Sequence, residues 1–413
     1  MFEQVNLRDI CESIDYGYTA SSTNERVGPN FLRITDIVPE QLDWSSVPFC
    51  EIDAKKAEKY RLRSGDIVIA RTGATTGWAK YIQDPPEAVF ASYLVRLRLK
   101  ASVDARYIGF VVTSSGYKDF IQRHMGGAAQ PNANAQILAS YPVPLPVLSE
   151  QHKIAQILSA YDELIENNQR RIRILEEMAR RLYREWFVHF RFPGHENHPR
   201  VPSPLGEIPK NWTISSLGQI TSKIGSGATP RGGKESYQQS GISLIRSLNV
   251  HDYYFEMDNL AFINDEQAVQ LDHVEVADRD VLLNITGASV GRCCMVQSSV
   301  LPARVNQHVA IVRADKVTAN PYFLLDTINN ETTKLRLLNL AQGGATREAL
   351  TKAALTAFPV VLPTQELVEE YGRRVGPLHA QREILSRQNE NLRRTRDLLL
   401  PRLLSGQIKL EAN

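Results

Sequence analysis

The spacing of apolar residues in the middle of the chain predicts a long coiled-coil helix. From Ile154 to Trp186, residues spaced alternately four and three apart are apolar in all but one case. These seam positions are Ile154, Leu158, Tyr161, Ile165, Asn168, Ile172, Leu175, Ala179, Leu182 and Trp186. Charged residues of both signs lie between them, as is typical of a solvated coiled-coil face. We therefore expect a first long helix over residues 149–190.

The same spacing recurs near the carboxyl end, and it predicts a second long helix within residues 365–413. Its seam positions are Tyr371, Val375, Leu378, Arg382, Leu385, Asn389, Leu392, Arg396, Leu399 and Leu403. We expect Gly376-Pro377 to break or delay the start of this helix, because proline lacks a backbone N–H. Each helix exposes an apolar stripe that needs a partner, and antiparallel pairing of the two helices is the natural closure.

Asn168 and Asn389 both occupy seam positions. A single buried asparagine on a seam can fix the register of a coiled coil. The alternative is that both side chains face solvent at a frayed edge. The sequence leaves these two interpretations open.

The rest of the chain contains the same globular segment twice, offset by about 214 to 217 residues. The run from Gly65 to Gly77 corresponds to the run from Asp280 to Gly291, and both contain a Thr-Gly-Ala turn. Pro-punctuated apolar strands close the two copies at 141–146 and 358–363. A period this long excludes a solenoid or propeller and indicates a duplicated domain. We place the copies at residues 1–148 and 211–364, joined through a Pro-rich linker at 191–210.

Short apolar runs separated by loops predict an α+β fold for each copy. We expect two similar mixed α/β domains joined by two long helices that form an antiparallel coiled coil. The expected strands are 31–34, 67–70 and 94–99 in the first copy, with counterparts at 244–246, 281–283 and 309–312. The expected helices are 106–122 and 321–340.

Composition and charge limit the kind of protein this is. With 43% apolar and 23% charged residues, the chain has the composition of an ordinary globular protein. No run of about 18 apolar residues is present, and the first residues lack the layout of a signal peptide, so we expect a cytoplasmic protein without a membrane partner. With a net charge of +2, the chain is less basic than a protein that binds nucleic acid without partners. A DNA-binding chain of this charge would concentrate its arginines on one face or borrow phosphate contacts from partner subunits.

Signatures of catalysis and of metal binding are missing. The turn from Asp84 to Glu87 resembles a methyltransferase loop but has no aromatic residue to stack a flipped base. Asp53-Ala54-Lys55 is too short a match to indicate a nuclease, and no Walker loop is present. The histidines at 195 and 198 have no third ligand nearby, and the four cysteines have no CxxC spacing. We expect reduced cysteines, no bound metal and no catalytic residue.

The loops of the two copies carry the residue types that bond base edges and phosphates. Arginine suits guanine, while asparagine and glutamine suit adenine. The alternative is that these small polar residues merely fill turns. The candidate DNA-binding residues are Tyr16, Tyr18, Thr19, Ser21, Ser22, Arg71, Thr72, Gly73, Thr75, Gln130, Asn132, Asn134, Ser226, Thr229, Arg231, Asn284, Thr286, Ser289, Arg292, Thr346 and Arg347.

With this layout, the chain resembles the DNA specificity subunits of type I restriction-modification systems along essentially its full length. The residues that carry the resemblance are the strand exits at 142–146 and 359–363, the helix start at 150–158, the helix end at 182–187, the Gly-Gly-Ala-Thr-Arg segment at 343–347 and the closing segment at 403–408. The resemblance implies two target recognition domains, each reading one half of a bipartite DNA target. It implies that the helix pair acts as a ruler between them.

The resemblance also implies partners and their cofactors. Two modification subunits would bind S-adenosylmethionine and methylate adenine, and restriction subunits would use ATP and Mg to translocate and cleave DNA. This chain itself would bind none of these cofactors. The second helix start, at Thr364, lacks the Glu-Gln pair found at Glu150. The rival interpretations are a coiled-coil adaptor without enzymatic activity and a self-contained DNA-modifying enzyme.

Overall fold

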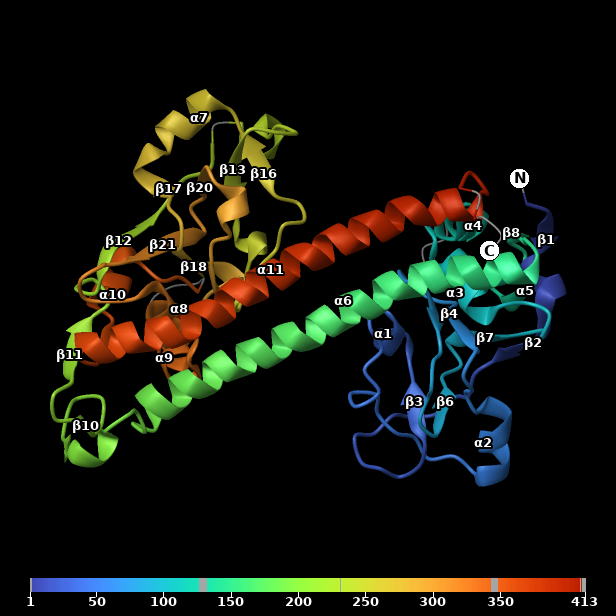
Figure 1. Ribbon diagram of the computed structural model, residues 1–413, viewed down its shortest axis with the longest axis horizontal. Helices are drawn as coiled ribbons and strands as arrows, with labels where there is room; N and C mark the ends of the chain where they lie inside the picture. The colour runs from blue at the N-terminus through green and yellow to red at the C-terminus, as the bar shows by residue number, and fades with distance from the viewer. Residues whose placement is uncertain (1, 126–131, 231, 343–347, 409, 411–413) are drawn as a thin grey trace. The chain divides into compact units, whose positions relative to one another are not determined.

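The computed structural model describes residues 2–125, 132–230, 232–342, 348–408 and 410 (Figure 1). The chain forms two compact units. The first contains Met1–Arg170 with Ser386–Asn413, and the second contains Arg171–Leu385. Each long helix therefore contributes residues to both units. We call residues 4–144 the first domain and residues 213–362 the second domain.

The first domain is built on an antiparallel sheet with the strand order β2-β7-β4-β5. Strand β4 (Ile67–Ala70) is buried at every residue, as its run of β-branched side chains requires. The predictions of strands at 67–70 and 94–99 are confirmed. The other strands of this domain are β1 (Gln4–Asn6), β2 (Cys11–Tyr16), β3 (Asn30–Leu32), β5 (Ala79–Tyr81), β6 (Ala88–Phe90), β7 (Leu94–Leu99) and β8 (Pro142–Pro144). Its helices are α1 (Ile34–Ile37), α2 (Ala54–Tyr60), α3 (Ala105–Thr113), α4 (Ser115–Met125) and α5 (Ala135–Leu138).

The second domain repeats this sheet with the order β12-β21-β18-β19. Its strands are β11 (Thr213–Ser216), β12 (Thr221–Ser226), β13 (Ile242–Ile245), β14 (Val250–His251), β15 (Tyr254–Phe255), β16 (Ala261–Ile263), β17 (Glu275–Val276), β18 (Val281–Asn284), β19 (Cys293–Met295), β20 (Ala303–Val305), β21 (Val309–Ala314) and β22 (Pro359–Leu362). Its helices are α7 (Asp265–Gln270), α8 (Pro321–Asn329), α9 (Glu331–Gln342) and α10 (Lys352–Ala357). The parallel pair β3-β6 in the first domain has its counterpart in β13-β20.

The same side-chain ion pair also occurs inside each of the two domains. Buried Asp66 accepts two hydrogen bonds of 3.0 Å from Arg98, and buried Asp280 accepts two of 2.7 Å from Arg313 at the matching place. These pairs repeat at the offset read from the sequence, so the duplication extends from the strand order down to single ion pairs.

Two expected helices are each interrupted. The helix predicted over 106–122 is α3 and α4, because Ser114 breaks it: its Oγ donates to the Val111 carbonyl at 2.6 Å and accepts from the Tyr117 N–H at 3.3 Å. The helix predicted over 321–340 is α8 and α9. There the side chain of Asn330 accepts from the Thr332 N–H at 3.1 Å. In both copies a local side-chain bond replaces the helical backbone bond.

The first long helix is α6 (Leu148–Tyr183), which ends in a π-helical turn at Arg184–Val188. The second is α11 (Gln365–Leu404), which runs without a break through Gly376-Pro377. The expected break at that dipeptide is therefore wrong. Tyr371 and Val375 just before it are fully buried, and this burial outweighs the cost of proline within a helix.

The two helices pair in opposite directions within each unit. In the first unit, Leu158 near the start of α6 shares a core with Leu403 near the end of α11. In the second unit, Trp186 shares a core with Tyr371. Every seam position predicted from the sequence is buried or partly buried.

Asn168 and Asn389 face each other inside the first unit. Asn168 is 7% exposed and Asn389 is 2% exposed. The Asn168 Nδ2 donates to Asn389 Oδ1 at 3.0 Å, and the Asn389 Nδ2 donates to the Ile165 carbonyl at 3.3 Å. The interpretation that both asparagines face solvent is therefore wrong.

The Pro-rich segment between α6 and the second domain is packed rather than extended. It contains a hairpin of β9 (Arg200–Val201) and β10 (Ile208–Pro209). Phe192 and Ile208 are buried in the same core as Trp186. Among the described residues, no helix is both long and apolar enough to cross a bilayer.

Candidate nucleic-acid interface

Three of the candidate residues of the first domain come together at the end of its sheet. Tyr16 ends β2, Arg71 follows β4, and Asn132 lies in the chain that bridges back to Thr72. The Arg71 guanidinium lies 4.9 Å from the centre of the Tyr16 ring, and its Nη2 donates to Asn132 Oδ1 at 3.3 Å. The Tyr16 hydroxyl accepts from the Ala135 N–H at 3.0 Å. Tyr16 is 43% exposed, so the cluster has a solvent-facing aromatic ring beside a cation.

The backbone next to Arg71 explains why this cluster forms. The Ala133 N–H donates to the Arg71 carbonyl at 2.8 Å, which joins the segment after residue 131 to the end of β4. Gly73 then turns the chain with a φ of +77°, in the region that favours glycine. A Cβ at Gly73 would meet nothing within 4 Å. The turn therefore protrudes from the sheet.

Two exposed aromatic residues beside this cluster were missed by the sequence analysis. Tyr93 is 59% exposed, and its carbonyl accepts from the Arg71 N–H at 3.0 Å. Trp78 is 36% exposed, with the Lys118 ammonium 4.8 Å from its ring centre. Exposed rings beside cations are typical of surfaces that contact nucleic acids. Tyr93 lies directly before the predicted strand 94–99, which was the available signal for it, whereas no predicted strand adjoins Trp78.

The second domain carries a chain of polar hydrogen bonds at the matching place. The Thr286 hydroxyl lies 2.6 Å from His308 Nδ1, and His308 Nε2 lies 3.1 Å from Gln307 Nε2. The Thr229 hydroxyl donates to Gln307 Oε1 at 2.5 Å. Thr286 and Thr229 were predicted, while Gln307 and His308 were missed.

His308 occupies the position of Tyr93. The Ile285 N–H donates to the His308 carbonyl at 3.0 Å, just as the Arg71 N–H donates to the Tyr93 carbonyl. The turn that follows also repeats, because Gly287 has a φ of +74° and open space where a Cβ would stand. The same backbone thus presents an aromatic and cationic set in one domain and a set of threonine, histidine and glutamine side chains in the other.

The loops after β2 and β12 approach their own chain closely. A Cβ at Gly17 would overlap the carbonyl oxygen of Ala91, and a Cβ at Gly227 would overlap that of Val305. These glycines therefore allow contact with the parallel strand pair of each domain. They leave the hydroxyl-bearing neighbours at the surface.

The remaining described candidates occupy varied positions. Thr19, Ser21, Ser22 and Arg292 are exposed, whereas Tyr18, Thr72, Thr75 and Ser226 are partly buried. Tyr18 packs against the Tyr60 ring at 5.4 Å between centres, and Ser22 accepts a hydrogen bond from Arg33 at 3.5 Å. Arg292 lies 3.4 Å from His251.

Two predicted contact residues make hydrogen bonds within the fold. Asn284 is 0% exposed, and its Nδ2 donates to the Ser247 carbonyl at 2.9 Å and to Ser289 Oγ at 3.2 Å. The prediction that Asn284 contacts bases is wrong, because the side chain points inward from the end of β18. Asn134 is at the surface, but its Oδ1 caps α5 by accepting from the Ile137 N–H at 2.9 Å. The candidates Gln130, Arg231, Thr346 and Arg347 lie outside the described residues.

The motifs that resembled catalytic sites have structural positions. Asp53 caps α2 through the N–H groups of Lys55 and Lys56. Asp84 lies in an exposed turn with a φ of +42°. The four cysteines are free and buried, and burial raises the pKa of Cys50 to about 11. Over the part of the chain that the structure describes, no three His, Cys, Asp or Glu residues are grouped to hold a metal ion.

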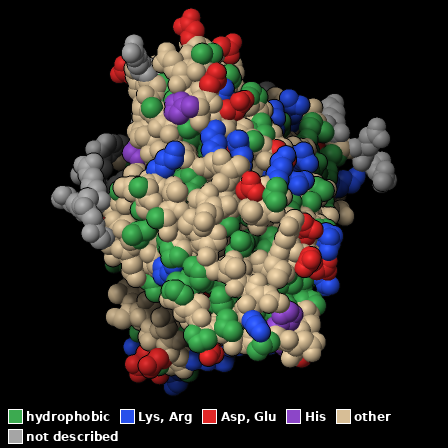
Figure 2. Space-filling view, turned by 90° about the vertical axis from the view of Figure 1, so that its left-hand side faces the viewer, with side chains coloured by type: hydrophobic (Ala, Val, Ile, Leu, Met, Phe, Trp, Pro, Cys, Tyr) green, Lys and Arg blue, Asp and Glu red, His purple; other side chains and the backbone are tan. Residues whose placement is uncertain are grey.

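On the face drawn in Figure 2, basic side chains lie among acidic ones. This mixture agrees with the net charge of +2.

Comparison with known proteins finds similar chains of one kind. Residues 1–177 match the family model of the type I restriction modification DNA specificity domain. The MjaX specificity subunit of a type I restriction enzyme from Methanocaldococcus jannaschii is 24% identical over 99% of this chain and 94% of its own length. The HindI specificity subunit from Haemophilus influenzae is 22% identical, covering 67% of this chain and 71% of its own.

A solved structure shares the fold. The crystal structure of the type I restriction-modification S subunit from M. genitalium superposes with a TM-score of 0.63 at 14% identity, over 98% of this chain and 96% of that one. The relatives support the interpretation of the chain as a DNA specificity subunit over a coiled-coil adaptor or a self-contained modifying enzyme. In sequence and in fold, with its duplicated domains and paired helices, the chain is thus similar to type I restriction-modification DNA specificity subunits.

Proposed function

We propose that this chain selects the DNA target of a type I restriction-modification complex and has no catalytic activity of its own. The first domain reads one half of a bipartite target and the second domain reads the other. The observation that carries the proposal is that two domains with one strand order present different side chains from the same turn. A shared scaffold with different surface residues is what two different half-sites require.

The chemistry of the two turns suits base recognition. The Arg71 guanidinium can donate twice to the O6 and N7 atoms of guanine, and Asn132 can pair with adenine. In the second domain, Thr286, His308 and Gln307 offer both donors and acceptors. Because the chain has a charge of only +2, most phosphate contacts would come from partner subunits.

We place the borders of the parts as the sequence suggested. The recognition domains are 1–148 and 211–364, the helices are 149–190 and 365–413, and 191–210 is the connecting segment. The helix pair holds the two domains a set distance apart and provides docking surface for two modification subunits. These subunits carry S-adenosylmethionine, and the restriction subunits carry ATP and Mg. The complex works in the cytoplasm.

The start of α6 already has a device that ties it to the first domain. Gln151 is 2% exposed. Its Nε2 donates to the Pro146 carbonyl at 2.7 Å, and its Oε1 accepts from the Asp104 N–H at 2.9 Å. This glutamine belongs to the helix start that the family resemblance rests on, and it supports the proposal that α6 is held firmly relative to its domain.

Base reading is tested by methylation of a randomised target library with the chain and its modification subunit. We expect Arg71→Gln to alter base preference in one half-site and Thr286→Val to alter it in the other. Each base pair that is read contributes about 1–3 kcal/mol of discrimination. Arg63→Gln is the matched control, because Arg63 is exposed and pairs with Glu58. The proposal fails if Arg71→Gln and Thr286→Val change the same half-site or neither.

The ruler is tested by adding one heptad to both helices. Repeating residues 169–175 in α6 and 382–388 in α11 lengthens each by about 10 Å. We expect the preferred spacer to change while both half-sites keep their bases. An unchanged spacer in the methylation assay contradicts the ruler but leaves base reading intact.

A further inference from the structure

Helix α11 carries three polar residues on its otherwise apolar seam, and they are spaced by seven. They are Arg382, Asn389 and Arg396. Asn389 pairs with Asn168 of α6. The two arginines also contact α6, and each one reaches a loop of the domain in its own unit. Placing a charged residue on a seam costs desolvation free energy unless ion pairs and hydrogen bonds offset it, and an apolar residue cannot make those contacts.

In the first unit, Arg396 joins α6 to the first domain. Its Nη1 lies 2.6 Å from Asp162 Oδ1 of α6 and 3.4 Å from Glu40 Oε1 of the loop after α1. Arg393, on the preceding turn of α11, holds the same carboxylate, with its Nη2 2.8 Å from Glu40 Oε2. Burial raises the pKa of Glu40, but the hydrogen bond and charge of Arg393, with the charge of Arg396, outweigh it and lower that pKa below its usual value.

The loop that carries Glu40 is also fixed from the sheet side. The Lys80 ammonium, on β5, donates to the carbonyls of Pro39 and Glu40 at 2.7 and 2.8 Å. A continuous set of contacts therefore runs from the sheet of the first domain through this loop to α11.

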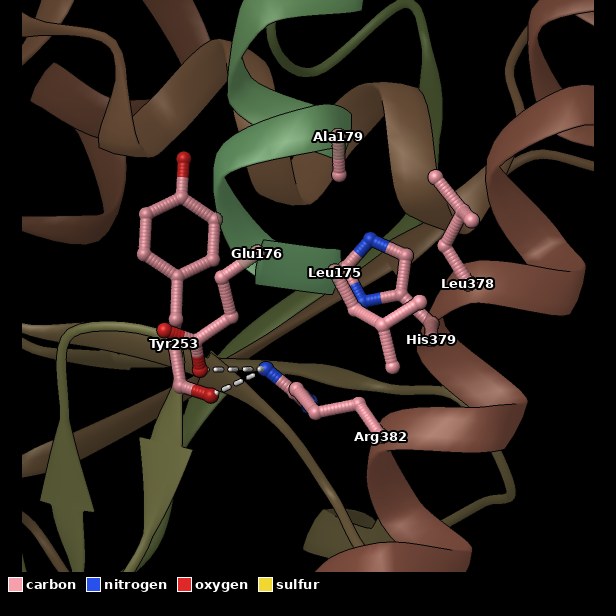
Figure 3. Close-up of a pocket in the computed structure, with 7 residues that line it drawn as sticks. All are labelled: Leu175, Glu176, Ala179, Tyr253, Leu378, His379 and Arg382. Atoms are coloured by element: carbon pink, nitrogen blue, oxygen red, sulfur yellow. Dashed lines mark hydrogen bonds and ion pairs between the residues drawn. The ribbon is translucent and has the colours of Figure 1, made fainter. Parts of the chain in front are cut away.

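In the second unit, Arg382 makes the corresponding connection. Its Nη1 donates to the Tyr253 carbonyl at 2.6 Å and lies 3.8 Å from Glu176 Oε1 of α6 (Figure 3). The Arg180 guanidinium of α6 covers the Tyr253 ring at 4.6 Å. The loop is again fixed from the sheet, because the Tyr253 N–H donates to the Cys293 carbonyl of β19 at 2.9 Å.

Glu40 and Tyr253 occupy the same place in the two copies. Each lies seven residues after an arginine that starts a capping box, Arg33 in the first domain and Arg246 in the second. Each loop is fixed by an edge strand of the repeated sheet, β5 or β19. Two loops with different side chains therefore contact two arginines that lie seven residues on either side of Asn389.

We propose that Arg382 and Arg396 are positioning residues that fix how each recognition domain is set on the helix pair. Resting on the proposed function, this assigns them control over which spacer lengths the complex accepts. Neither arginine is needed to read bases. Each one converts the register of the helices into the orientation of a recognition domain.

The experiment measures methylation of targets with the native spacer and with spacers one base pair longer or shorter, using the chain with its modification subunit. We expect Glu40→Gln to reduce the preference for the native spacer by about threefold, since it weakens a partly exposed ion pair. Arg382→Met removes a partly buried donor and leaves the Tyr253 carbonyl without it, so it should reduce the preference by about tenfold. Arg382→Lys should restore it to within about twofold, because lysine keeps the donor and the charge.

The matched controls keep their ion pairs away from a domain contact. Glu58 pairs with Arg61 and Arg63 inside the first domain, and Glu370 pairs with Arg373 and Arg374 along α11. Glu58→Gln and Glu370→Gln should leave spacer preference unchanged. Thermal melting confirms that each variant is folded, and hydrogen exchange over residues 38–46 in the full chain gives a second measure for Glu40→Gln.

Relaxed spacer preference with unchanged half-site bases, in the test variants and not in the controls, supports the positioning role. Spacer preference equal to that of the wild type in folded Glu40→Gln and Arg382→Met overturns it, and so does a change in the bases that are read. A wild-type complex that methylates no bipartite target overturns the proposed function instead. Hydrogen exchange over residues 38–46 tests the contact between Glu40 and α11 separately. Faster exchange in Glu40→Gln than in the wild type supports this contact, and unchanged exchange overturns it.

Discussion

Replacing Asn389 by leucine removes one half of a buried amide pair and tests how the seam fixes its register. The pair is closed to solvent, with Asn168 7% exposed and Asn389 2% exposed. Asn389 accepts from Asn168 at 3.0 Å and donates to the Ile165 carbonyl at 3.3 Å. Either single change to leucine leaves the other amide buried without this partner, whereas the double change leaves two apolar side chains in contact.

The magnitude follows from counting the lost and orphaned groups. The hydrogen bond between the two amides contributes about 1 kcal/mol, and each buried amide without a partner costs about 1 kcal/mol or more. Each single variant loses the bond and gains one orphan, but the double variant loses the bond once and has no orphan. The two changes should therefore be coupled by about 2–3 kcal/mol. Burial of each leucine taken alone cancels in the cycle, whereas the contact between the two leucines occurs only in the double variant and adds to the coupling.

Amide hydrogen exchange is the assay, because it reports the opening free energy of α6 and α11 separately from the rest of the chain. Protection is compared in the wild type, in Asn168→Leu, in Asn389→Leu and in the double variant. Asn167 and Asn391 are exposed neighbours on the same helices, so Asn167→Leu and Asn391→Leu are the matched controls. A coupling energy within about 0.5 kcal/mol of zero would show that the amides act independently and would refute the reasoning.

Two further predictions concern the second unit. Burial, with the charge of Arg382, lowers the pKa of His379 to about 3, so the folded protein keeps this histidine neutral while the unfolded chain protonates it below about pH 6.5. The free energy of unfolding therefore falls as the pH drops from about 6.5 towards 3. Urea unfolding should show that His379→Phe loses about 2 kcal/mol less than the wild type between pH 7 and pH 5. Equal losses in the wild type and in His379→Phe would contradict this. Asp280 is 1% exposed and holds Arg313 through two bonds of 2.7 Å; Asp280→Asn should cost about 3 kcal/mol, whereas a cost no larger than that of exposed Asp258→Asn would contradict a structural role for the pair.

The regular elements were predictable where burial is continuous along the chain. The run 67–70 is buried on every side chain, and the seam of α6 is apolar at every position except Asn168. The failures lie where particular side-chain contacts, local or distant in sequence, decide whether a helix ends. Ser114 ends α3 with its own hydroxyl, which a search for apolar periodicity does not register. Pro377 stays within α11 because Tyr371 and Val375 are buried by residues of other elements.

The sequence predicted which residue types lie in the loops of the candidate interface, but not whether each side chain points to solvent or into the core. Arg71, Asn132, Thr229 and Thr286 could be named because loops rich in such residues flank the repeated turn. Asn284 was named on the same grounds, yet its position on β18 turns the amide inward. Composition alone does not distinguish an amide that reads a base from one that closes a core, because both need the same donors and acceptors.

The contacts of the seam arginines could not be predicted from the sequence pattern and required the structure. Arg382 and Arg396 are visible as interruptions in a heptad, and by pattern alone they only make the second helix more polar. Their meaning depends on partners far away in the chain, since Arg396 meets Glu40 across 356 residues and Arg382 meets Tyr253 across 129. Because the two partners occupy the same place in a duplicated fold, contact at both sites follows from the duplication of the domain together with the symmetry of the seam about Asn389. A duplicated reader on a paired helix needs such contacts, since similar domains without a fixed orientation would read two half-sites but accept many spacers.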